Sequence, residues 1–418
     1  MYAADPMSKF KGALAMGVPG ELAGLHAAWS SYGRLPWKSL FVPAIKLARD
    51  GYTVVPYVAN ALKAVEANVL ADPGLRAVFA PEGQVLVAGA LCRNPALADT
   101  WTPWRSTASR CSTVAPSGRG SWRTVEVSAA LRADAMGFTF LGMPPPSSGT
   151  VGMALVLNIL GGYKSAEFLR GFLGVHRLVE AVKHMLAVRM DLGDPGFVNA
   201  AGIVSEMLSP AFADKVRQRI ADNTTFPPAY YLPKWSQLRD NGTSHLCVVD
   251  GDRNAVAMTT TLAGVVGASG GTNIIAAVTQ VFLNHFVLGM SPLVAVQSPR
   301  VYHSLVPNVV RYEDETVVDG EVIELKAEAR EFLRRRGHVL KGTVWSAVCQ
   351  MIVQDLQAPV SSGSENVFHG MLTAVSDPRK DGRSKLFDRT FAPHKDGVIR
   401  ILEVRDSTYC NQVGHRRT

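Results

Sequence analysis

The chain has 418 residues, of which 47% are hydrophobic and 19% are charged. This composition supports a substantial core in one large domain or two, does not favour a disordered chain, and excludes the collagen-like and low-complexity classes. The net charge of +8 does not indicate nucleic-acid binding, because the positive surplus falls in two short stretches, 100–124 and 378–418. The rest of the chain is nearly neutral and has no basic face for a nucleic acid.

The five cysteines are scattered without a Cys-x-x-Cys pair, which predicts neither a disulfide framework nor a zinc site: Cys92, Cys111, Cys247, Cys349 and Cys410. The N-terminal stretch 1–12 lacks the apolar run of a signal peptide. The long uncharged stretch 273–290 carries polar residues on one helical stripe, which favours a buried amphipathic helix over a membrane span. We therefore expect no signal or transmembrane segment in this chain.

Residues 20–90 predict a series of helices. The segment 21–32 stops before Gly33 and the segment 39–50 stops before Gly51, and glycine is the residue that helix C-termini favour. The composition then changes: residues 100–124 are rich in Ser, Thr, Arg and Pro, and their apolar residues follow neither a helical nor a strand period. We interpret 100–124 as a loop or a disordered insert.

Further helices are predicted along the middle and end of the chain. Residues 151–160 follow a proline-rich turn, and residues 176–191 are amphipathic, with a core side formed by Leu178, Val179, Val182, Met185, Leu186 and Met190. Ser209-Pro210 supplies a cap and a first-turn proline for a helix that runs to about Ala221. Residues 324–336 form another helix, with arginines at its C-terminal end.

A β-hairpin is predicted from two β-type runs, 244–249 and 255–261, which flank a turn-rich loop. If Val249 pairs with Ala255, the register places Thr243 opposite Thr261 at the open end of the hairpin. Directly opposed side chains in an antiparallel pair lie close together, so two hydroxyls would meet there. An ordinary cross-strand threonine pair gives the same pattern, and spacing alone leaves the function open.

Residues 267–271 lie between a strand-like piece and a helical segment that starts at Asn273. Their Gly-x-Ser-x-Gly pattern is that of a nucleophile elbow, which would make Ser269 a nucleophile. The acid and the base would follow in the order Asp314 or Asp319, then His338. Alternatively, the backbone N–H groups of Gly270 and Gly271 could form an oxyanion or anion site at the helix N-terminus. A tight strand–helix turn also accounts for the pattern.

Three residues share one face of the 176–191 helix: His176, Glu180 and His184. Neighbours in this series could share a metal ion, but its two ends lie about 12 Å apart along the helix axis. We therefore interpret them as polar-edge and core residues, and we predict no metal site and no cofactor. His303 and His338 have no partner that the sequence identifies.

The segment 241–250 (NGTSHLCVVD), together with 254–261 (NAVAMTTT), resembles the signature of the γ-glutamyltranspeptidases, or glutathione hydrolases. Further segments resemble the same family: AMGVPGELAGLH (15–26), YGRLPWKSLFVPAIKLARDGY (32–52), MPPPSSGTVG (143–152), HRLVEAVKHM (176–185), LGDPGFVN (192–199), GASGGTNII (267–275), SPRVYH (298–303) and AVSDPRK (374–380). The segments 222–231 and 235–245 are most similar to plant members.

The resemblance implies an α+β fold, the αββα sandwich of N-terminal-nucleophile hydrolases, in which the precursor cuts itself before a threonine. Here the cut would fall between Gly242 and Thr243. The new N-terminal amine would act as the general base while the Thr243 hydroxyl attacks a γ-glutamyl amide. Thr261 would hydrogen-bond and position Thr243, and Gly270 and Gly271 would form the oxyanion hole.

The resemblance also implies an organisation into subunits and a set of partners. Residues 1–242 would form a large-subunit-like part and residues 243–380 a small-subunit-like part, while 100–124 and 381–418 match nothing in the family. The substrates would be glutathione and other γ-glutamyl compounds, with an amino acid, a dipeptide or water as acceptor, and without nucleic acid. The expected location is secreted, at the cell surface or plasma membrane, or vacuolar.

We expect the sandwich to be incomplete. The family carries an arginine that clamps the substrate α-carboxylate in a segment before the stretch where this chain starts. After Leu262 it continues with an Asn, a Tyr/Phe-Gly element, an acidic pair for the α-amine and a Ser-Ser pair, whereas Ala263 holds the Asn position here. Two alternatives therefore stay open: a catalytically defective truncated isoform or gene-model product, and a serine esterase that uses Ser269.

Overall fold

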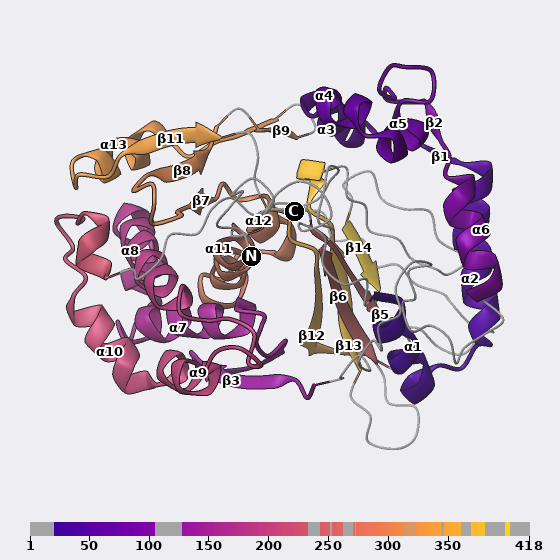
Figure 1. Ribbon diagram of the computed structural model, residues 1–418. Helices are drawn as coiled ribbons and strands as arrows, with labels where there is room; N and C mark the ends of the chain where they lie inside the picture. Colours follow the sequence, from indigo (N-terminus) through magenta and orange to yellow (C-terminus); the bar gives the residue numbers. More distant parts are fainter. Residues whose placement is uncertain are drawn as a thin grey trace. The chain divides into compact units, whose positions relative to one another are not determined.

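The computed structural model describes residues 21–104, 128–232, 243–250, 253–261, 271, 273–314, 316–318, 321–343, 347–360, 369–380 and 398–401. The chain divides into two compact units, whose elements are labelled in Figure 1. The first unit comprises residues 1–128, 242–244 and 260–267, and the second comprises 129–241, 245–259 and 268–418. The boundary expected at residue 242 is the position of a cleaved peptide bond. A division of the chain by compactness does not test it.

The first unit is mainly helical, as the sequence predicts. Its described elements are α1 (Glu21–Tyr32), α2 (Trp37–Asp50), α3 (Pro56–Ala64), α4 (Glu66–Ala71), α5 (Pro73–Phe79) and α6 (Pro95–Trp104), with β1 (Tyr52–Thr53) paired antiparallel to β2 (Leu91–Cys92). The helices expected at 21–32 and 39–50 are confirmed, the second starting two residues earlier. Gly51, at φ 99°, ends α2 in a conformation that residues with a Cβ rarely adopt.

The expectation of a loop throughout 100–124 is wrong for its first residues, because α6 continues through Trp104. Ala98 is buried with Trp37 and Phe41 of α2, and Trp101, one turn later, packs against the same cluster. This apolar contact between helices holds the end of α6, although its composition is that of a loop. Residues 105–124 lie outside the described residues.

The second unit begins with the hairpin β3 (Leu131–Ala135) and β4 (Phe138–Gly142). Helices follow: α7 (Gly149–Gly161), η4 (Ala166–Leu169), α8 (Gly171–Arg189), α9 (Ala200–Leu208), α10 (Pro210–Gln218) and η5 (Pro228–Tyr231). The Ser209 hydroxyl accepts a hydrogen bond from the Phe212 N–H, as predicted for the cap of α10. That helix ends at Gln218, three residues before the expected end.

The remaining elements of the second unit form helices and small sheets. They are β5 (Thr243–Val249), β6 (Ala255–Thr261), α11 (Asn273–Phe282), η6 (Leu283–Val287), α12 (Pro292–Gln297), β7 (Val301–Tyr302), β8 (Val310–Glu313), β9 (Thr316–Val318), β10 (Glu321–Ile323), α13 (Ala327–Arg334), β11 (Leu340–Thr343), β12 (Met351–Val360), β13 (His369–Val375), η7 (Pro378–Lys380) and β14 (Val398–Ile401). The ends of β5 and β6 belong to the first unit. One sheet has the order β11-β8-β7, with β11 parallel to β8, and another has the antiparallel order β12-β13-β14.

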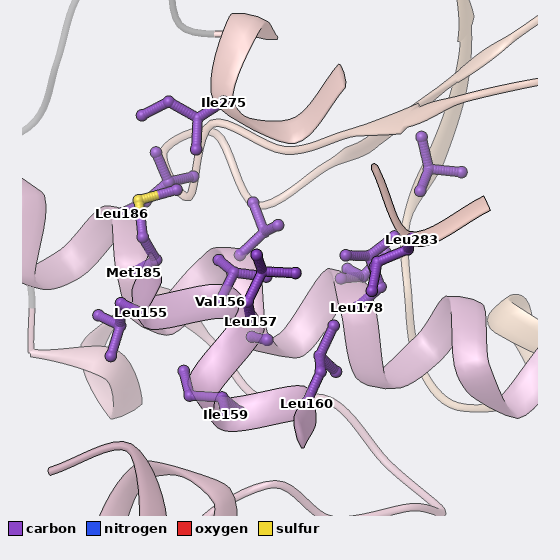
Figure 2. Packing of buried hydrophobic residues seen from close by; sticks show 14 of the residues in the cluster. Leu155, Val156, Leu157, Ile159, Leu160, Leu178, Met185, Leu186, Ile275 and Leu283 are labelled. Carbon is purple, nitrogen blue, oxygen red and sulfur yellow. The ribbon is translucent and has the colours of Figure 1, made fainter. Parts of the chain in front are cut away.

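The core of the second unit lies where α7, α8 and α11 pack together, as Figure 2 shows. Leucine, isoleucine and valine side chains cover most of α7, and eight of its thirteen residues are buried, so this helix is enclosed on nearly all sides. The core side predicted for residues 176–191 is confirmed, except that Met190 is only half-buried. However, α8 is not a surface helix with a polar edge, because His176, Glu180, Lys183 and His184 are buried too.

The prediction of a buried polar-striped helix at 273–290 is confirmed by α11 and the π-helical segment η6 that continues it. Thr279 is buried and donates to the Ile275 carbonyl. The buried Gln280 amide exchanges two hydrogen bonds of 2.9 Å with the backbone of Val301, which joins α11 to β7. Among the described helices, none is both long and apolar enough to cross a bilayer.

Candidate active site and the buried polar clusters beside it

The β5–β6 hairpin follows the predicted register at two places. Next to its loop, the Asp250 N–H donates to the Asn254 carbonyl at 3.1 Å, and the Asp250 carboxylate accepts from the N–H and the amide of Asn254. Five residues further along each strand, His245 Nδ1 lies 2.9 Å from the Thr259 hydroxyl. Both contacts join residues at equal distances from the loop, so the strands are paired in register along this length.

Two residues beyond His245 and Thr259, the same register reaches Thr243 and Thr261. Both are described as the terminal strand residues of β5 and β6, but their side chains lie outside the described part of the chain, as do Gly242 and the strand expected at 263–266. Since side chains alternate along a strand, His245 and Cys247 share one face of β5. That face is the more covered one, because Leu246 and Val248 on the other face are about half exposed.

His245 is held neutral by its surroundings. Burial lowers the pKa of its imidazole, and a hydrogen bond to the backbone of Met258 offsets part of that effect. Burial likewise raises the pKa of the neighbouring Cys247 thiol, which disfavours the thiolate. The described part of this face therefore carries uncharged hydrogen-bonding groups, with no thiolate nucleophile beside the threonine positions.

The glycine-rich turn is described only at Gly271, which precedes α11 with φ 38° and accepts a hydrogen bond from the Ile274 N–H. The candidate residues Ser269 and Gly270 lie outside the described residues. The serine-elbow hypothesis also requires a base at His338, but that ring is buried against His176, and the acid beside it is Glu180. Asp314 is instead 3.9 Å from Arg330.

A buried polar cluster surrounds Glu180, and the sequence analysis did not foresee it. One oxygen of the Glu180 carboxylate accepts from the Thr225 hydroxyl at 2.6 Å and lies 3.3 Å from the Lys183 ammonium, while the other accepts from Tyr231. Lys183 also donates to Thr225 and to the Phe226 carbonyl. Both oxygens of this fully buried carboxylate therefore accept hydrogen bonds, and these bonds offset the free-energy cost of burying its charge.

His176 and His338, which the sequence does not connect, lie next to each other in this cluster. This corrects the expectation that His338 has no partner. His176 Nδ1 lies 2.8 Å from His338 Nε2, and His176 Nε2 lies 2.8 Å from the Ala221 carbonyl. Because a carbonyl only accepts, His176 Nε2 carries the proton, and Nδ1 is free to accept from His338. Burial lowers the pKa of both rings, to about 3 for His338, so the pair is neutral.

Distance alone would allow His176, Glu180 and His338 to share a metal ion, since their ligand atoms lie within 4.8 Å of one another. A metal would have to replace the histidine–histidine hydrogen bond and sit beside the Lys183 ammonium, which already balances the charge of Glu180. The donors therefore fit a hydrogen-bond network better than a metal site.

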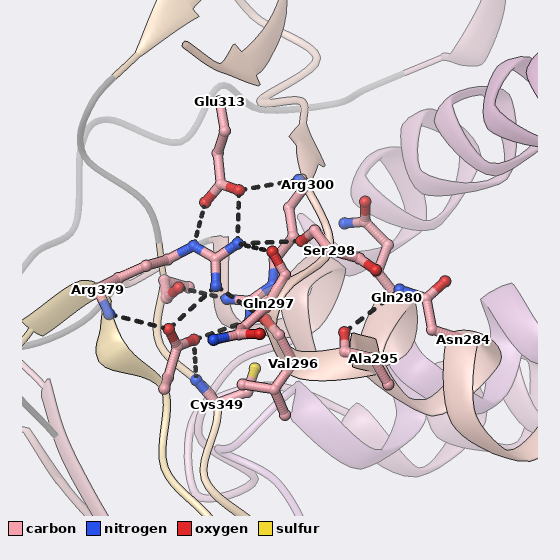
Figure 3. A network of polar contacts seen from close by, with 12 residues as sticks. Gln280, Asn284, Ala295, Val296, Gln297, Ser298, Arg300, Glu313, Cys349 and Arg379 are labelled. Atoms are coloured by element: carbon pink, nitrogen blue, oxygen red, sulfur yellow. Dashed lines mark hydrogen bonds and ion pairs between the residues drawn. The ribbon is translucent and has the colours of Figure 1, made fainter. Parts of the chain in front are cut away.

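A second buried network joins the two segments SPRVYH and AVSDPRK, which are far apart in the sequence (Figure 3). The Arg379 guanidinium forms a two-pronged pair with the Glu313 carboxylate, with both N···O distances 2.8 Å. Asp377 accepts from Arg300 at 2.8 Å, from Arg379 at 3.0 Å and from the Cys349 N–H at 2.9 Å. All four charged side chains are at most 2% exposed.

The charges of this network stabilise one another. Burial opposes ionisation of Asp377, but the guanidinium groups of Arg300 and Arg379 outweigh it and hold the pKa of that carboxyl below its usual value. Burial raises the pKa of the Cys349 thiol to about 11, so this cysteine remains a thiol. The network fixes α12 to the end of β13, because both arginines also donate to the Val296 carbonyl.

Comparison with a solved structure shows the fold. The crystal structure of cephalosporin acylase from Bacillus halodurans is similar over 89% of this chain and 78% of that chain, with a TM-score of 0.68 at 19% identity. The chain thus has the α+β fold of N-terminal-nucleophile hydrolases.

Sequence comparison identifies the family. The model of the family described as Gamma-glutamyltranspeptidase matches residues 1–106, 123–264 and 262–387. The chain is 42% identical to glutathione hydrolase 3 of Arabidopsis thaliana, covering 92% of this chain and 75% of that protein. It is 38% identical to glutathione hydrolase 2 of the same plant, covering 91% and 80%. The chain belongs to the γ-glutamyltranspeptidase family and is of the glutathione hydrolase type.

The alignments also show where this chain differs from its relatives. The match to glutathione hydrolase 3 spans 486 aligned positions, but 92% of 418 residues is about 385, which leaves about 100 positions without a residue here. The family match is interrupted between 106 and 123, and its second and third pieces meet at 262–264. The second junction immediately follows the end of β6.

Proposed function

We propose that this chain is a glutathione hydrolase precursor that cuts itself between Gly242 and Thr243, and that Thr243 then carries the γ-glutamyl group. The observation that supports this most is the register of the β5–β6 hairpin, whose bonded pairs lead to Thr243 opposite Thr261. Family membership supports the same residues, because the family match runs through both. The parts before and after the cut, 1–242 and 243–380, would be the large-subunit-like and small-subunit-like parts.

In this proposal the new amine of Thr243 acts as the general base. It takes the proton of the Thr243 hydroxyl while Oγ attacks the γ-glutamyl carbonyl carbon, and it returns that proton to the leaving amine as the amide bond breaks. Thr261 donates a hydrogen bond that orients the attacking hydroxyl, and the N–H groups of Gly270 and Gly271 stabilise the oxyanion. Water or an acceptor amine then releases the γ-glutamyl group from the ester.

The substrates follow from the family. We propose glutathione and related γ-glutamyl compounds as donors, and water, an amino acid or a dipeptide as acceptor. We also propose a secreted, cell-surface or vacuolar location.

The alignment gap favours a second candidate, a chain that cuts itself but turns over glutathione poorly. Self-cleavage needs Thr243, a base and an oxyanion site. Turnover also needs partners for the charged α-amine and α-carboxylate of the substrate, and the acidic pair that serves the α-amine in the family would follow Leu262, where the pieces of the family match meet. A charge left unpaired in a partly buried site costs about 3–5 kcal/mol. Even the lower value is more than a hundredfold in rate.

Processing is tested on a denaturing gel with purified full-length chain. We expect fragments of about 26 and about 19 kDa, in proportion to chain length, and Thr243→Ala should remain whole. Ser244→Ala changes the next residue along the chain, so it serves as the neighbouring control and should be cut normally. Fragments that persist in Thr243→Ala would mean that another protease makes them, and would contradict the proposal.

Turnover is measured with γ-glutamyl-p-nitroanilide on the processed chain, using Thr243→Ala as the blank. Turnover within tenfold of an intact family member would support a competent glutathione hydrolase. Turnover at least a hundredfold lower, in a chain that is fully cut, would support the second candidate. A chain that neither cuts itself nor turns over substrate would contradict both.

A further inference from the structure

The first turn of α11 is held to the β7–β8 strand pair by an arginine. Arg311 lies on β8, and its Nη2 donates to the side-chain carbonyl of Asn273, the first residue of α11, at 2.8 Å. The same nitrogen donates at 2.9 Å to the hydroxyl of Ser304, two residues after β7. Asn273 is itself buried. Arg311 therefore joins the start of the helix to the connection between the two strands.

The helix has a second attachment on the same face. The Gln280 amide is bonded to the backbone of Val301 on β7, and Gln280 follows Asn273 by seven residues. Residues seven apart are separated by about two turns, so they share one face of a helix. Gln280 fixes the C-terminal half of α11 to the strands, whereas Asn273 fixes the end that leads back to the glycine-rich turn.

That end carries Gly271, the described member of the glycine pair proposed for the oxyanion hole. The Gly271 carbonyl accepts from the Ile274 N–H at 3.1 Å, so the turn is bonded to the residue that follows Asn273. Gly271 has φ 38°, in the left-handed region that favours glycine. Because glycine has no side chain to pack, the position of its N–H group depends on what holds the first turn of the helix.

The charge of Arg311 acts against the helix that it holds. The N-terminus of a helix carries a partial positive charge, so a cation beside it is unfavourable and an anion or a neutral cap is the usual choice. The same positive charge becomes favourable when an oxyanion forms beside Gly271, because it adds to the field of the backbone N–H groups. Residues that oppose local stability in this way are expected at functional sites.

We propose that Arg311 is a positioning residue for the oxyanion turn: through Asn273 it fixes the first turn of α11, and with it the Gly271 N–H that receives the oxyanion. This inference rests on the proposed function, because it takes Gly270 and Gly271 as the oxyanion donors. The oxyanion exists only in the transition state and the intermediates beside it, so a displaced donor weakens the chemical step more than substrate binding. Loss of Arg311 should therefore lower the rate of acylation and leave the affinity for substrate nearly unchanged.

The test uses processed full-length chain and γ-glutamyl-p-nitroanilide, with enzyme in excess, so that release of p-nitroaniline reports a single acylation. The rate is measured over a range of enzyme concentrations, which separates the saturating rate from the half-saturating concentration. Arg311→Met keeps the length of the side chain but removes its donors and its charge, and it should lower the saturating rate about 10–100-fold. Arg311→Lys restores the charge and a donor, and should recover part of that rate. A general loss of folding would not produce this split or this rescue.

A second variant tests the link through Asn273. Asn273→Leu removes the acceptor and should give the same loss of rate, and the double variant should be no slower than either single variant, because both changes break one bond. Hydrogen–deuterium exchange in peptides from the first turn of α11 should rise in both variants, while the part held by Gln280 stays protected. Exchange is also measured on uncut precursor, so a variant that fails to process still gives a result.

Arg330→Met is the matched control. Arg330 lies on α13 and packs on the ring of Tyr312, the residue after Arg311 in β8, so this change removes an arginine near the same strand without touching α11. Its acylation rate and its exchange in α11 should match those of the wild type. Wild-type rate or unchanged exchange in Arg311→Met, or losses that add in the double variant, would overturn the proposal and leave the proposed function intact. Wild-type chain that releases no p-nitroaniline would contradict the proposed function itself, and this proposal with it.

Discussion

Replacing Asp377 by asparagine isolates the charge of one carboxylate in the buried arginine network. The side chain is fully buried and keeps its shape, but one of its oxygens becomes an NH2 group. One carboxylate oxygen, Oδ2, accepts from Arg300 and from the Cys349 N–H. The other, Oδ1, accepts from Arg379. In either orientation, the new NH2 group faces donors.

The expected cost is large because two guanidinium groups would then share the single carboxylate of Glu313. Removing one partner of a buried ion pair costs about 3–5 kcal/mol, which is a large part of the ~5–15 kcal/mol that stabilises a typical protein. With a urea dependence of about 3 kcal/mol per molar, the unfolding midpoint should fall by at least about 1 M. An exposed pair provides the matched control: Glu331→Gln, which removes the negative charge beside Arg335, should cost at most about 0.5 kcal/mol.

The probe must report the second unit. Tryptophan fluorescence would not isolate this unit, because four of the seven tryptophans, Trp29, Trp37, Trp101 and Trp104, belong to the first unit. Hydrogen–deuterium exchange of peptides from α12 and β13, recorded across a urea series, reports the network directly. If Asp377→Asn and Glu331→Gln shift these peptides equally, the charges of the network do not contribute to stability in the way that its geometry implies.

The remaining predictions concern the cluster around Glu180. Burial lowers the pKa of His184 and of His338 to about 3, whereas an unfolded histidine titrates near 6.5. The unfolded chain therefore binds more protons below pH 6.5, and stability should fall with acidification by about 1.4 kcal/mol per pH unit for each such histidine. Urea midpoints between pH 7 and pH 5 measure this loss, and His338→Gln should make the dependence shallower; an unchanged slope would contradict the assignment. Tyr231→Phe removes a donor to the buried Glu180 carboxylate and should cost about 1.5–3 kcal/mol. Tyr230→Phe, which removes a bond to the Arg219 carbonyl, should cost about 1 kcal/mol, and equal losses by urea unfolding would refute the special role of Glu180.

Local signals explain the parts of the fold that the sequence predicts well. Ser209 caps α10 and Gly51 ends α2 because capping depends on residues within one turn of the helix end. The hairpin register depends on a short loop, where Asp250 bonds to Asn254, and it extends to His245 and Thr259 without help from distant residues. The family is likewise readable from short segments, because they occur together in one chain.

The sequence by itself therefore determined the helices, the hairpin with its candidate threonines and the family. Only the tertiary structure decided which polar residues meet in the core. His176 and His338 are 162 residues apart, and Arg300 and Asp377 are 77 residues apart. The periodicity of a segment indicates which of its faces is buried, but it carries no information about what covers that face. The polar side of α8 was expected to be a polar edge, yet the segment 222–231 and His338 cover it. A buried charge is tolerated only where such distant partners supply its hydrogen bonds.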